Sequence, residues 1–194
     1  MALPYIFDGP IECDRLSLRL LTPDDTDAVH AWMSDPEVVR YQLYEPRDRD
    51  TVAEKVAEYA LATRLESNGD YVQPAIVVDG VVIGAIYFTI SNVDDLTAEI
   101  GWALNATYHG QGYAAEAARA MLGLAFGEMG LHRVFAELDP RNASSIALCR
   151  RLGMRHEAHF VENVMFKGEW ADTDIFAILA REWTTRASGV PKLA

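Results

Sequence analysis

The stretch YHGQGYAAEAARAMLGLAF, residues 108–126, joins a glycine-punctuated turn to an alanine-rich segment. The two glycines of the turn, Gly110 and Gly112, have no Cβ to keep a ligand away from the backbone N–H groups. Alanine favours helix, so a helix is predicted over residues 113–129, ending at Gly130. Because the N-terminus of a helix attracts anions, this stretch predicts a binding site for an anionic group.

The segments on either side of this stretch carry strand and helix signals. TAEIGWAL (97–104) comes before the turn and HRVFAEL (132–138) comes after the helix, and both have the composition of strands. DPRNASSIALCRRLG (139–153) has capping side chains at its start and Gly153 at its end, which predicts a capped helix. The predicted order in this half of the chain is strand, helix, strand, helix.

The N-terminal part begins with another strand. RLSLRLL (15–21) alternates apolar and polar residues, so one face is expected to be buried. The residues expected to point inward are Leu16, Leu18 and Leu20. Thr22 as N-cap and Pro23 in the first turn then start a short helix that ends near residues 34–36.

Three further segments complete the prediction. Apolar residues at helical spacing predict a helix within residues 45–70 that stops at Asn68 and Gly69. In PAIVVDGVVIGAIYFTI (74–90), Asp79 and Gly80 join two strand-like runs, which is the strongest short hairpin signal. Residues 154–183 predict two long strands joined by Lys167, Gly168 and Glu169, and residues 184–194 are expected to form a mobile polar tail.

Composition limits the class of protein. The chain has 194 residues, half of them hydrophobic and 24% charged, which is typical of a single globular domain. The net charge of −12 disfavours binding to nucleic acid and suits a cationic substrate. No apolar run is long enough for a membrane helix and the N-terminus lacks a signal peptide, so we expect a cytoplasmic protein.

No metal site is expected from the cysteines and histidines. Cys13 and Cys149 stand far apart, which is typical of reduced cytosolic thiols. His156 and His159 form HEAH, but no third ligand has suitable spacing, so they are interpreted as ordinary strand residues.

Several blocks, in order, resemble one enzyme family. Residues 109–114, HGQGYA, are similar to motif A of the GCN5-related N-acetyltransferases (GNAT), [Q/R]-x-x-G-x-[G/A], with His109 in place of Gln or Arg. Further blocks resemble the ribosomal-protein N-acetyltransferases of the RimJ and RimL kind. These blocks are DRLSLRLLTPDD, SDPEVVRY, AEIGWAL, GYAAEA, PRNASSIALCRRLGM and GEWADTDIFAILAREW. The resemblance covers residues 12–183, which we expect to be the core of a single domain.

The resemblance implies an α/β (α+β) GNAT fold. Such a fold has a mixed, mostly antiparallel, twisted sheet of about seven strands flanked by about four helices. It also implies that 97–104 and 132–138 are adjacent parallel strands that splay apart into a V.

The resemblance further implies an acetyl-CoA-dependent N-acetyltransferase that acetylates a primary amine by direct attack in a ternary complex. The pantetheine arm is expected along the strand edge near Leu104, the pyrophosphate at the glycine turn, and Asn142 beside the pantetheine. The expected cofactor-binding residues are therefore Leu104, His109, Gly110, Gln111, Gly112, Tyr113, Ala114, Ala115 and Asn142. Trp32 and Tyr41 fall in the region that lines the acceptor cleft in relatives.

Two residues are candidates for proton transfer. Glu99 is the expected general base because its apolar neighbours could raise its pKa, although it could instead be a solvent-facing or structurally paired glutamate. Ser145 is the expected acid for the departing thiolate, ranked ahead of Cys149. Asn142 and Ser145 could also be simple helix-capping residues.

The sequence leaves the acceptor open. It could be a protein N-terminus, a polyamine or an antibiotic, and a non-catalytic acyl-CoA-binding module or regulator is the alternative to an enzyme. Acidic residues expected to rim the acceptor side, Asp35, Glu37, Glu45, Asp94 and Asp95, suit any cationic amine. The long terminal strands could pair across a homodimer.

Overall fold

The computed structural model describes residues 3–187, with side chains through residue 183. Its strands are β1 (Tyr5–Ile6), β2 (Ile11–Glu12), β3 (Ser17–Arg19), β4 (Arg64–Leu65), β5 (Tyr71–Val72), β6 (Ala75–Val78), β7 (Val81–Asn92), β8 (Thr97–Leu104), β9 (Arg133–Leu138), β10 (Arg155–Phe166) and β11 (Glu169–Leu179). Its helices are α1 (Thr26–Met33), α2 (Arg49–Leu61), α3 (Tyr113–Gly127), α4 (Ala143–Leu152) and α5 (Ala180–Ala187), with 3-10 turns η1 (Pro23–Asp25), η2 (Val39–Tyr41) and η3 (Ala106–Tyr108).

One large sheet organises the fold. Within the described residues it has nine strands, in the order β10-β11-β9-β8-β7-β6-β3-β2, with β5 also paired to β7. All its pairings are antiparallel except the one between β8 and β9. The mixed, mostly antiparallel sheet expected from the sequence is confirmed.

The parallel pair β8 and β9 is joined over a short distance only. The two strands pair at Thr97 with Arg133, Ala98 with Val134 and Glu99 with Phe135. Beyond this ladder β8 stays with β7 to its end, while β9 stays with β11. The strands therefore part immediately after Glu99, which agrees with the expected splayed arrangement.

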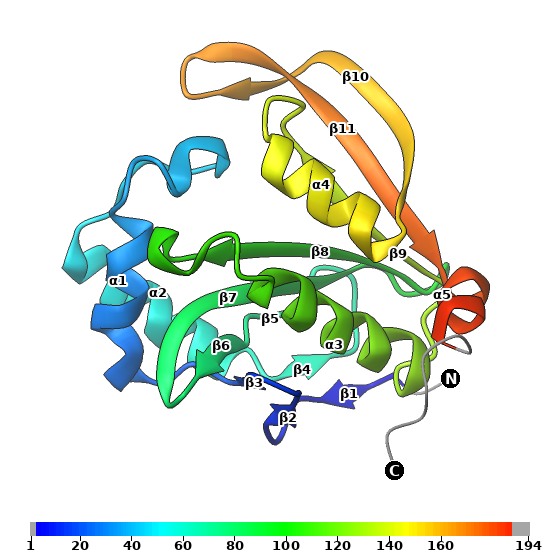
Figure 1. Ribbon diagram of the computed structural model, residues 1–194, viewed down its shortest axis with the longest axis horizontal. Helices are drawn as coiled ribbons and strands as arrows, with labels where there is room; N and C mark the ends of the chain where they lie inside the picture. The colour runs from blue at the N-terminus through cyan, green and yellow to red at the C-terminus, as the bar shows by residue number, and fades with distance from the viewer. Residues whose placement is uncertain (1–2, 188–194) are drawn as a thin grey trace.

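The helices cover both faces of the sheet (Figure 1). Ile86 and Phe88 of β7 belong to the core cluster that includes residues of α3 and α4. Ala85, which points to the opposite face, belongs to the cluster of α1 and α2. The pair α3 and α4 thus packs on one face and the pair α1 and α2 on the other. The β10-β11 hairpin extends past α4 as a long arm.

Both predicted hairpins are confirmed, and their turns explain the residues used. Asp79 and Gly80 have φ of 50° and 79°, and Lys167 and Gly168 have φ of 50° and 86°. Two consecutive residues with positive φ are what a type I′ turn requires. The predicted strand 97–104 coincides with β8.

The helix predicted within residues 45–70 ends earlier than expected. α2 stops at Leu61, and the chain then forms β4, which pairs with β1. Leu65, taken for part of the helix, is fully buried opposite Tyr5. This pairing is long-range, so the local spacing gave no sign of it.

The strands β1, β2, β4 and β5 have two residues each, too few for a periodic pattern, and they raise the strand count above the expected seven.

Three smaller expectations also need correction. Leu20 is only half-buried, and Leu21 is buried instead against the cluster of α1 and α2. α3 ends at Gly127 rather than residue 129. α5 is a fifth helix that continues past residue 183 into the expected polar tail, and the rest of that tail, residues 188–194, lies outside the described residues.

No helix in the described part of the chain is both long and apolar enough to cross a membrane.

Candidate active site

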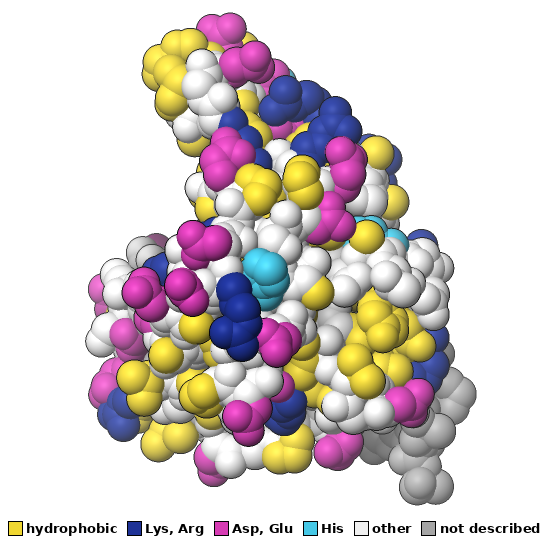
Figure 2. Space-filling view, turned by 90° about the vertical axis from the view of Figure 1, so that its left-hand side faces the viewer, with side chains coloured by type: hydrophobic (Ala, Val, Ile, Leu, Met, Phe, Trp, Pro, Cys, Tyr) yellow, Lys and Arg dark blue, Asp and Glu magenta, His cyan; other side chains and the backbone are white. Residues whose placement is uncertain are grey.

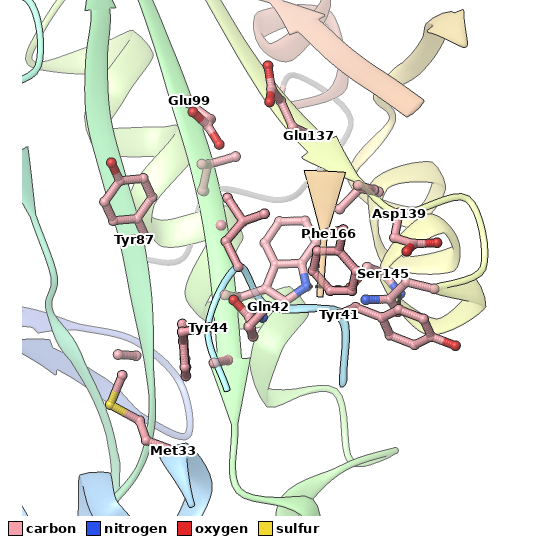
Figure 3. Close-up of a pocket in the computed structure, with 18 of the residues that line it drawn as sticks. Met33, Tyr41, Gln42, Tyr44, Tyr87, Glu99, Glu137, Asp139, Ser145 and Phe166 are labelled. Atoms are coloured by element: carbon pink, nitrogen blue, oxygen red, sulfur yellow. Dashed lines mark hydrogen bonds between the residues drawn. The ribbon is translucent and has the colours of Figure 1, made fainter. Parts of the chain in front are cut away.

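A cavity of about 750 Å³ lies where β8 and β9 part. Its lining combines β7, β8 and β9 with α2, the start of α4, the loop around η2 and the β10-β11 hairpin. Figure 3 shows Glu99, Tyr87, Ser145 and Phe166 around this space. The parting of two strands therefore opens the sheet at one point, and side chains from distant segments gather there.

Small side chains make room for the cavity. Along β8, Glu99, Gly101 and Ala103 share one face, and all three line the cavity. A Cβ built on Gly101 would meet only Tyr87 of the neighbouring strand, at 3.7 Å. The face that follows Glu99 thus carries almost no side-chain volume, which leaves space for a ligand beside the carboxylate.

Glu99 has the electrostatic setting that the sequence predicted for a base. Burial, followed by the nearby charge of Glu137, raises the pKa of its carboxyl from 4.5 to about 7. Figure 3 shows these two carboxylates together on one side of the cavity. A group that titrates near neutral pH can accept a proton at working pH and release it afterwards.

Asp139 is a contrasting carboxylate in the same cavity. Burial alone would raise its pKa, but hydrogen bonds from Arg141 hold the pKa below its ordinary value. Arg141 Nη2 lies 2.6 Å from Asp139 Oδ2. Asp139 therefore stays ionised and engaged, whereas the raised pKa of Glu99 suits proton transfer.

Asn142 and Ser145 both serve the start of α4. Asn142 is the N-cap, and its Oδ1 accepts hydrogen bonds from the backbone N–H of Ser145 (3.1 Å) and from Ser144 Oγ (2.8 Å). Asn142 therefore caps the helix, as one of the two interpretations of this residue predicted. Capping does not account for the hydroxyl of Ser145, because the cap uses only the backbone N–H of that residue.

The hydroxyl of Ser145 is held by Trp102. The indole Nε1–H of Trp102 donates to Ser145 Oγ at 3.2 Å. Trp102 belongs to β8 and Ser145 to the helix after β9, so this bond spans the parted strands. Since Oγ accepts this bond, its own proton is available to another acceptor in the cavity. The sequence did not indicate this role for Trp102.

Cys149, the other candidate acid, is unsuited. It is fully buried and does not line the cavity. Burial raises the pKa of its thiol to about 12. The ranking of Ser145 ahead of Cys149 is thus consistent with the geometry.

The glycine turn lies outside the cavity lining, at the N-terminus of α3. Gly112 is the N-cap in the left-handed region at φ 86°, and no side chain caps the helix. Gly110 also has positive φ, 74°. The first N–H groups of a helix have no partner within the helix. Here they are left free of any capping side chain, which suits an anionic ligand.

Arg15 braces this turn from a distant segment. Its backbone N–H and Nε donate to the two carboxylate oxygens of Glu116, at 2.8 and 2.7 Å. Its Nη1 donates to the carbonyl of Gln111 at 3.1 Å, and the guanidinium lies 4.9 Å from the ring centre of Tyr113. Sequence reasoning missed this brace because 101 positions separate Arg15 from Glu116.

The end of β8 is connected to the turn. His109 Nε2–H donates to the carbonyl of Leu104 at 2.9 Å. His109 therefore stabilises the connection between the end of β8 and the glycine turn. Leu104 itself is buried at the far end of the stretch of β8 that has no β9 partner.

The predicted site residues thus form two groups. Glu99, Asn142 and Ser145 meet at the cavity, while residues 109–115 form the glycine turn and the first positions of α3. Trp32 and Tyr41 also line the cavity, as the resemblance implied. None of the five acidic residues expected at the rim is part of the lining.

Part of the cavity wall is aromatic, which the sequence did not indicate. Tyr59, Tyr71 and Tyr87 follow one another, with ring centres of successive pairs 6.2 and 6.0 Å apart. The hydroxyl of Tyr71 donates to Glu58 Oε1 at 2.7 Å. Tyr44 and Arg47, from the loop before α2, complete this wall.

The hairpin arm reaches the loop around η2. Lys167 Nζ donates to the carbonyl of Val39 at 2.9 Å, and so joins the arm to the opposite side of the cavity. In Figure 2 the arm projects above the body of the molecule and carries both acidic and basic side chains.

His156 and His159 both contact one carboxylate of the arm. His156 Nε2 lies 3.0 Å and His159 Nδ1 2.8 Å from Asp174 Oδ1. No group of three or more His, Cys, Asp or Glu side chains among the described residues is arranged to hold a metal ion.

Comparison with known proteins gives consistent matches. The family model of the acetyltransferase (GNAT) domain matches residues 15–155. The chain is 35% identical over 178 residues to the uncharacterized N-acetyltransferase YnaD of Bacillus subtilis, covering 89% of this chain and 98% of that relative.

Solved structures match over similar lengths. The GNAT-family acetyltransferase from Bacillus anthracis has a TM-score of 0.81 and 31% identity, covering 90% of this chain and all of that one. The RimL ribosomal L7/L12 alpha-N-protein acetyltransferase in complex with coenzyme A has a TM-score of 0.76 at 16% identity, covering 88% and 98%. The second match confirms the predicted likeness to RimL at the level of the fold.

Proposed function

We propose a reaction from the premise that this chain belongs to the acetyltransferase (GNAT) family and is an acetyl-CoA-dependent acyltransferase. The proposal is that it acetylates a primary amine by direct attack in a ternary complex. The observation that carries it is Glu99, a carboxylate with a pKa of about 7 at the point where β8 and β9 part, beside a cavity large enough for an acceptor.

The residues present fit acetyl-CoA. The uncapped N–H groups at the start of α3 and the positive φ of Gly110 and Gly112 suit a pyrophosphate. Beyond Glu99, the β9-facing edge of β8 up to Leu104 has no strand partner, which suits the extended pantetheine arm. Asn142 stands at the same opening. The likeness to RimL, whose structure holds coenzyme A, supports this placement.

The assigned role of Glu99 is to take the proton of the attacking amine. Bound acetyl-CoA would supply an acetyl thioester as the electrophile. An α-amino group, with a pKa of about 7.7–8.0, needs little help to become neutral, whereas a lysine amine costs about 4–5 kcal/mol at pH 7. A base that titrates near 7 is matched to either acceptor, with more effect on the lysine amine.

The assigned role of Ser145 is to donate its hydroxyl proton toward the departing sulfur. Trp102 orients Ser145 Oγ by donating to it, which leaves the hydroxyl proton free. A thiolate with a pKa near 8.5 leaves readily without much help, so this contribution is expected to be small.

The test is release of free CoA thiol from acetyl-CoA in the presence of amines. A panel of α-amino peptides, lysine peptides, polyamines and aminoglycosides would be added in turn, with mass spectrometry of the acylated amine. We expect at least one class to give CoA release matched by amine acetylation. Tight acetyl-CoA binding without release for every class would contradict catalysis and favour the acyl-CoA-binding module instead.

The homodimer predicted from the terminal strands is retained as a proposal. β10 is the outermost strand of the main sheet and is 12 residues long, so its outer edge has backbone groups free to pair with a second copy. Light scattering at micromolar concentration should give twice the mass of the chain, and a monomer mass would contradict the pairing.

A further inference from the structure

The guanidinium of Arg47 is a cavity group that the proposed reaction does not use. Arg47 lies between η2 and α2 and lines the same cavity as Glu99. Its Nη1 atom is shielded from solvent and has no hydrogen-bond partner among the described residues. Buried donors almost always have a partner, and one without a partner is unfavourable. The fold thus presents a charged donor that the described residues do not satisfy.

The neighbours of Arg47 fix its position without neutralising it. Its guanidinium carbon lies 4.2 Å from the ring centre of Tyr44, which is a stacking contact. Its backbone N–H donates to the carbonyl of Met33 at 3.0 Å. Burial raises the pKa of the Tyr44 phenol to about 12, so this ring stays neutral. A stacked guanidinium keeps its edge free for a ligand.

The acidic side chain that interacts electrostatically with Arg47 is already engaged. Hydrogen bonds from Lys55 and Tyr71 lower the pKa of Glu58, and the charge of Arg47 adds to this effect. Lys55 Nζ lies 2.6 Å from Glu58 Oε2, and the Tyr71 hydroxyl lies 2.7 Å from Oε1. Both carboxylate oxygens therefore have other partners, and neither is bonded to Arg47.

The cavity lining thus includes both the Glu99 carboxylate and the Arg47 guanidinium. Figure 3 shows Glu99 and Glu137 on one side and Tyr44, the ring that Arg47 stacks on, on another. In this view Tyr87 lies between Glu99 and Tyr44. A ligand that spans this space meets a carboxylate base at one end and a guanidinium at the other.

We propose that Arg47 binds a carboxylate of the acceptor, so that the acceptor is a primary amine that also carries a carboxylate. This inference rests on the proposed acetyl transfer, because it assigns the amine end to Glu99. The planar fork of arginine binds a carboxylate through two parallel N–H bonds, and such charge-assisted pairs are strong. The carboxylate could belong to a free amino acid or to an acidic side chain near the N-terminus of a peptide.

The test compares amines that differ only in this group. One arm uses ω-amino acids from glycine to 6-aminohexanoate, each beside its carboxamide. The other arm uses the peptide Ala-Glu-Ala-amide beside Ala-Gln-Ala-amide, and CoA release gives kcat/KM for every member. We expect the wild type to prefer the acid by about 10- to 100-fold in at least one arm. The arm that shows the preference identifies the source of the carboxylate.

Three variants show whether Arg47 causes this preference. Arg47→Gln should bring the ratio of acid to amide close to 1, and Arg47→Lys should keep part of it, since charge remains but the fork is lost. Arg49→Gln is the matched control, because Arg49 is two residues away, pairs with Asp27 at 2.7 Å and does not line the cavity. It should retain the wild-type ratio.

The outcomes separate this inference from the proposed reaction. An equal response of the wild type to acid and amide in both arms, or an Arg47→Gln variant that keeps the preference, overturns the role of Arg47. If no amine releases CoA from the wild type, the proposed reaction fails. Calorimetric titration of the same pairs in the presence of CoA then decides: binding of the acid that is tighter than that of the amide and is lost in Arg47→Gln supports the role, and equal binding overturns it.

Discussion

The glycine turn and the cavity are built in opposite ways. At the turn, backbone N–H groups and the conformation of Gly110 and Gly112 provide the proposed binding surface, and the charges nearby are paired, as in Arg15 with Glu116. In the cavity, side chains provide the surface; Glu99 has a raised pKa, and Arg47 Nη1 has no hydrogen-bond partner among the described residues. In our proposal the backbone therefore binds acetyl-CoA, the ligand common to every turnover, whereas side chains of the cavity transfer the proton and select the acceptor.

The largest expected effect is that of replacing Glu99 in the cavity. Glu99→Gln should lower kcat/KM for the amine about 10²- to 10⁴-fold, because a carboxamide cannot take the proton. Part of the wild-type rise with pH should be centred near 7, where the carboxylate becomes ionised. The variant should lose this part and keep only the rise that comes from deprotonation of the amine. Stopped-flow or steady-state thiol release between pH 5.5 and 9 measures both effects.

Glu137→Gln is the matched control for that experiment. Removing its charge should lower the pKa of Glu99, so this variant should keep the pH-dependent rise and show it at lower pH than the wild type. The base assignment is wrong if Glu99→Gln keeps the full rate and the same pH profile.

The next effect concerns the turn. Gly112→Val should weaken acetyl-CoA binding about 10- to 100-fold in Kd, because the left-handed φ of 86° is unfavourable for a β-branched residue and the side chain obstructs the N–H groups. Isothermal titration measures the Kd. Gly69→Val has the same φ of 86° with nothing within 4 Å of its Cβ, so it reproduces the strain away from the turn and should leave the Kd unchanged. Normal binding by Gly112→Val would contradict the placement of the pyrophosphate.

A third prediction concerns the effect of Glu99 on the free energy of unfolding. The pKa of Glu99 is about 7 in the folded protein against an ordinary 4.5, so the folded state favours the protonated form. Stability is therefore lost as pH rises from about 4.5 to 7, and the loss is complete above 7. Glu99→Gln should be more stable than the wild type by about 1–2 kcal/mol at pH 8, after allowance for partial exposure, and by little at pH 4.5. Urea unfolding at the two pH values measures this, and an equal difference at both would refute the raised pKa.

The smallest effect is expected at Ser145. Ser145→Ala should lower kcat about 3- to 10-fold, because the thiolate leaves readily without an acid. The helix cap should survive, since Asn142 accepts from the backbone N–H that alanine retains. Thiol release gives kcat, and the loss of its partner should shift the emission of Trp102. A fall of more than 100-fold would show that the acid matters far more than we propose.

The sequence predicted the parts of the molecule that local patterns encode. β8 is a mostly apolar run of eight residues, α4 has Asn142 at its start and Gly153 at its end, and each hairpin turn has a glycine at positive φ. Each of these signals lies within a few neighbouring positions. The motif at the turn was found for the same reason.

The missed parts depend on contacts between distant segments. Arg15 reaches Glu116, and Trp102 reaches Ser145, across separations of 101 and 43 positions. Arg47 lies in the polar run EPRDRD, where nothing local distinguishes it from the neighbouring arginine. Only the folded structure shows that Arg47 stacks on Tyr44, that Glu58 is bonded to other residues, and that Arg47 Nη1 has no hydrogen-bond partner among the described residues.

The short ladder between β8 and β9 has a mechanical consequence. Three register pairs connect β9, β10 and β11 to the other strands of the large sheet. A rigid-body rotation of that half about the ladder would change the width of the opening without breaking the pairing inside either half. Glu99 lies in the last pair, next to the axis, and would move least. Lys167 at the tip of the arm would move furthest, and its hydrogen bond to the Val39 carbonyl would break. The carboxylate that we propose as the base thus lies where such a motion would displace the chain least.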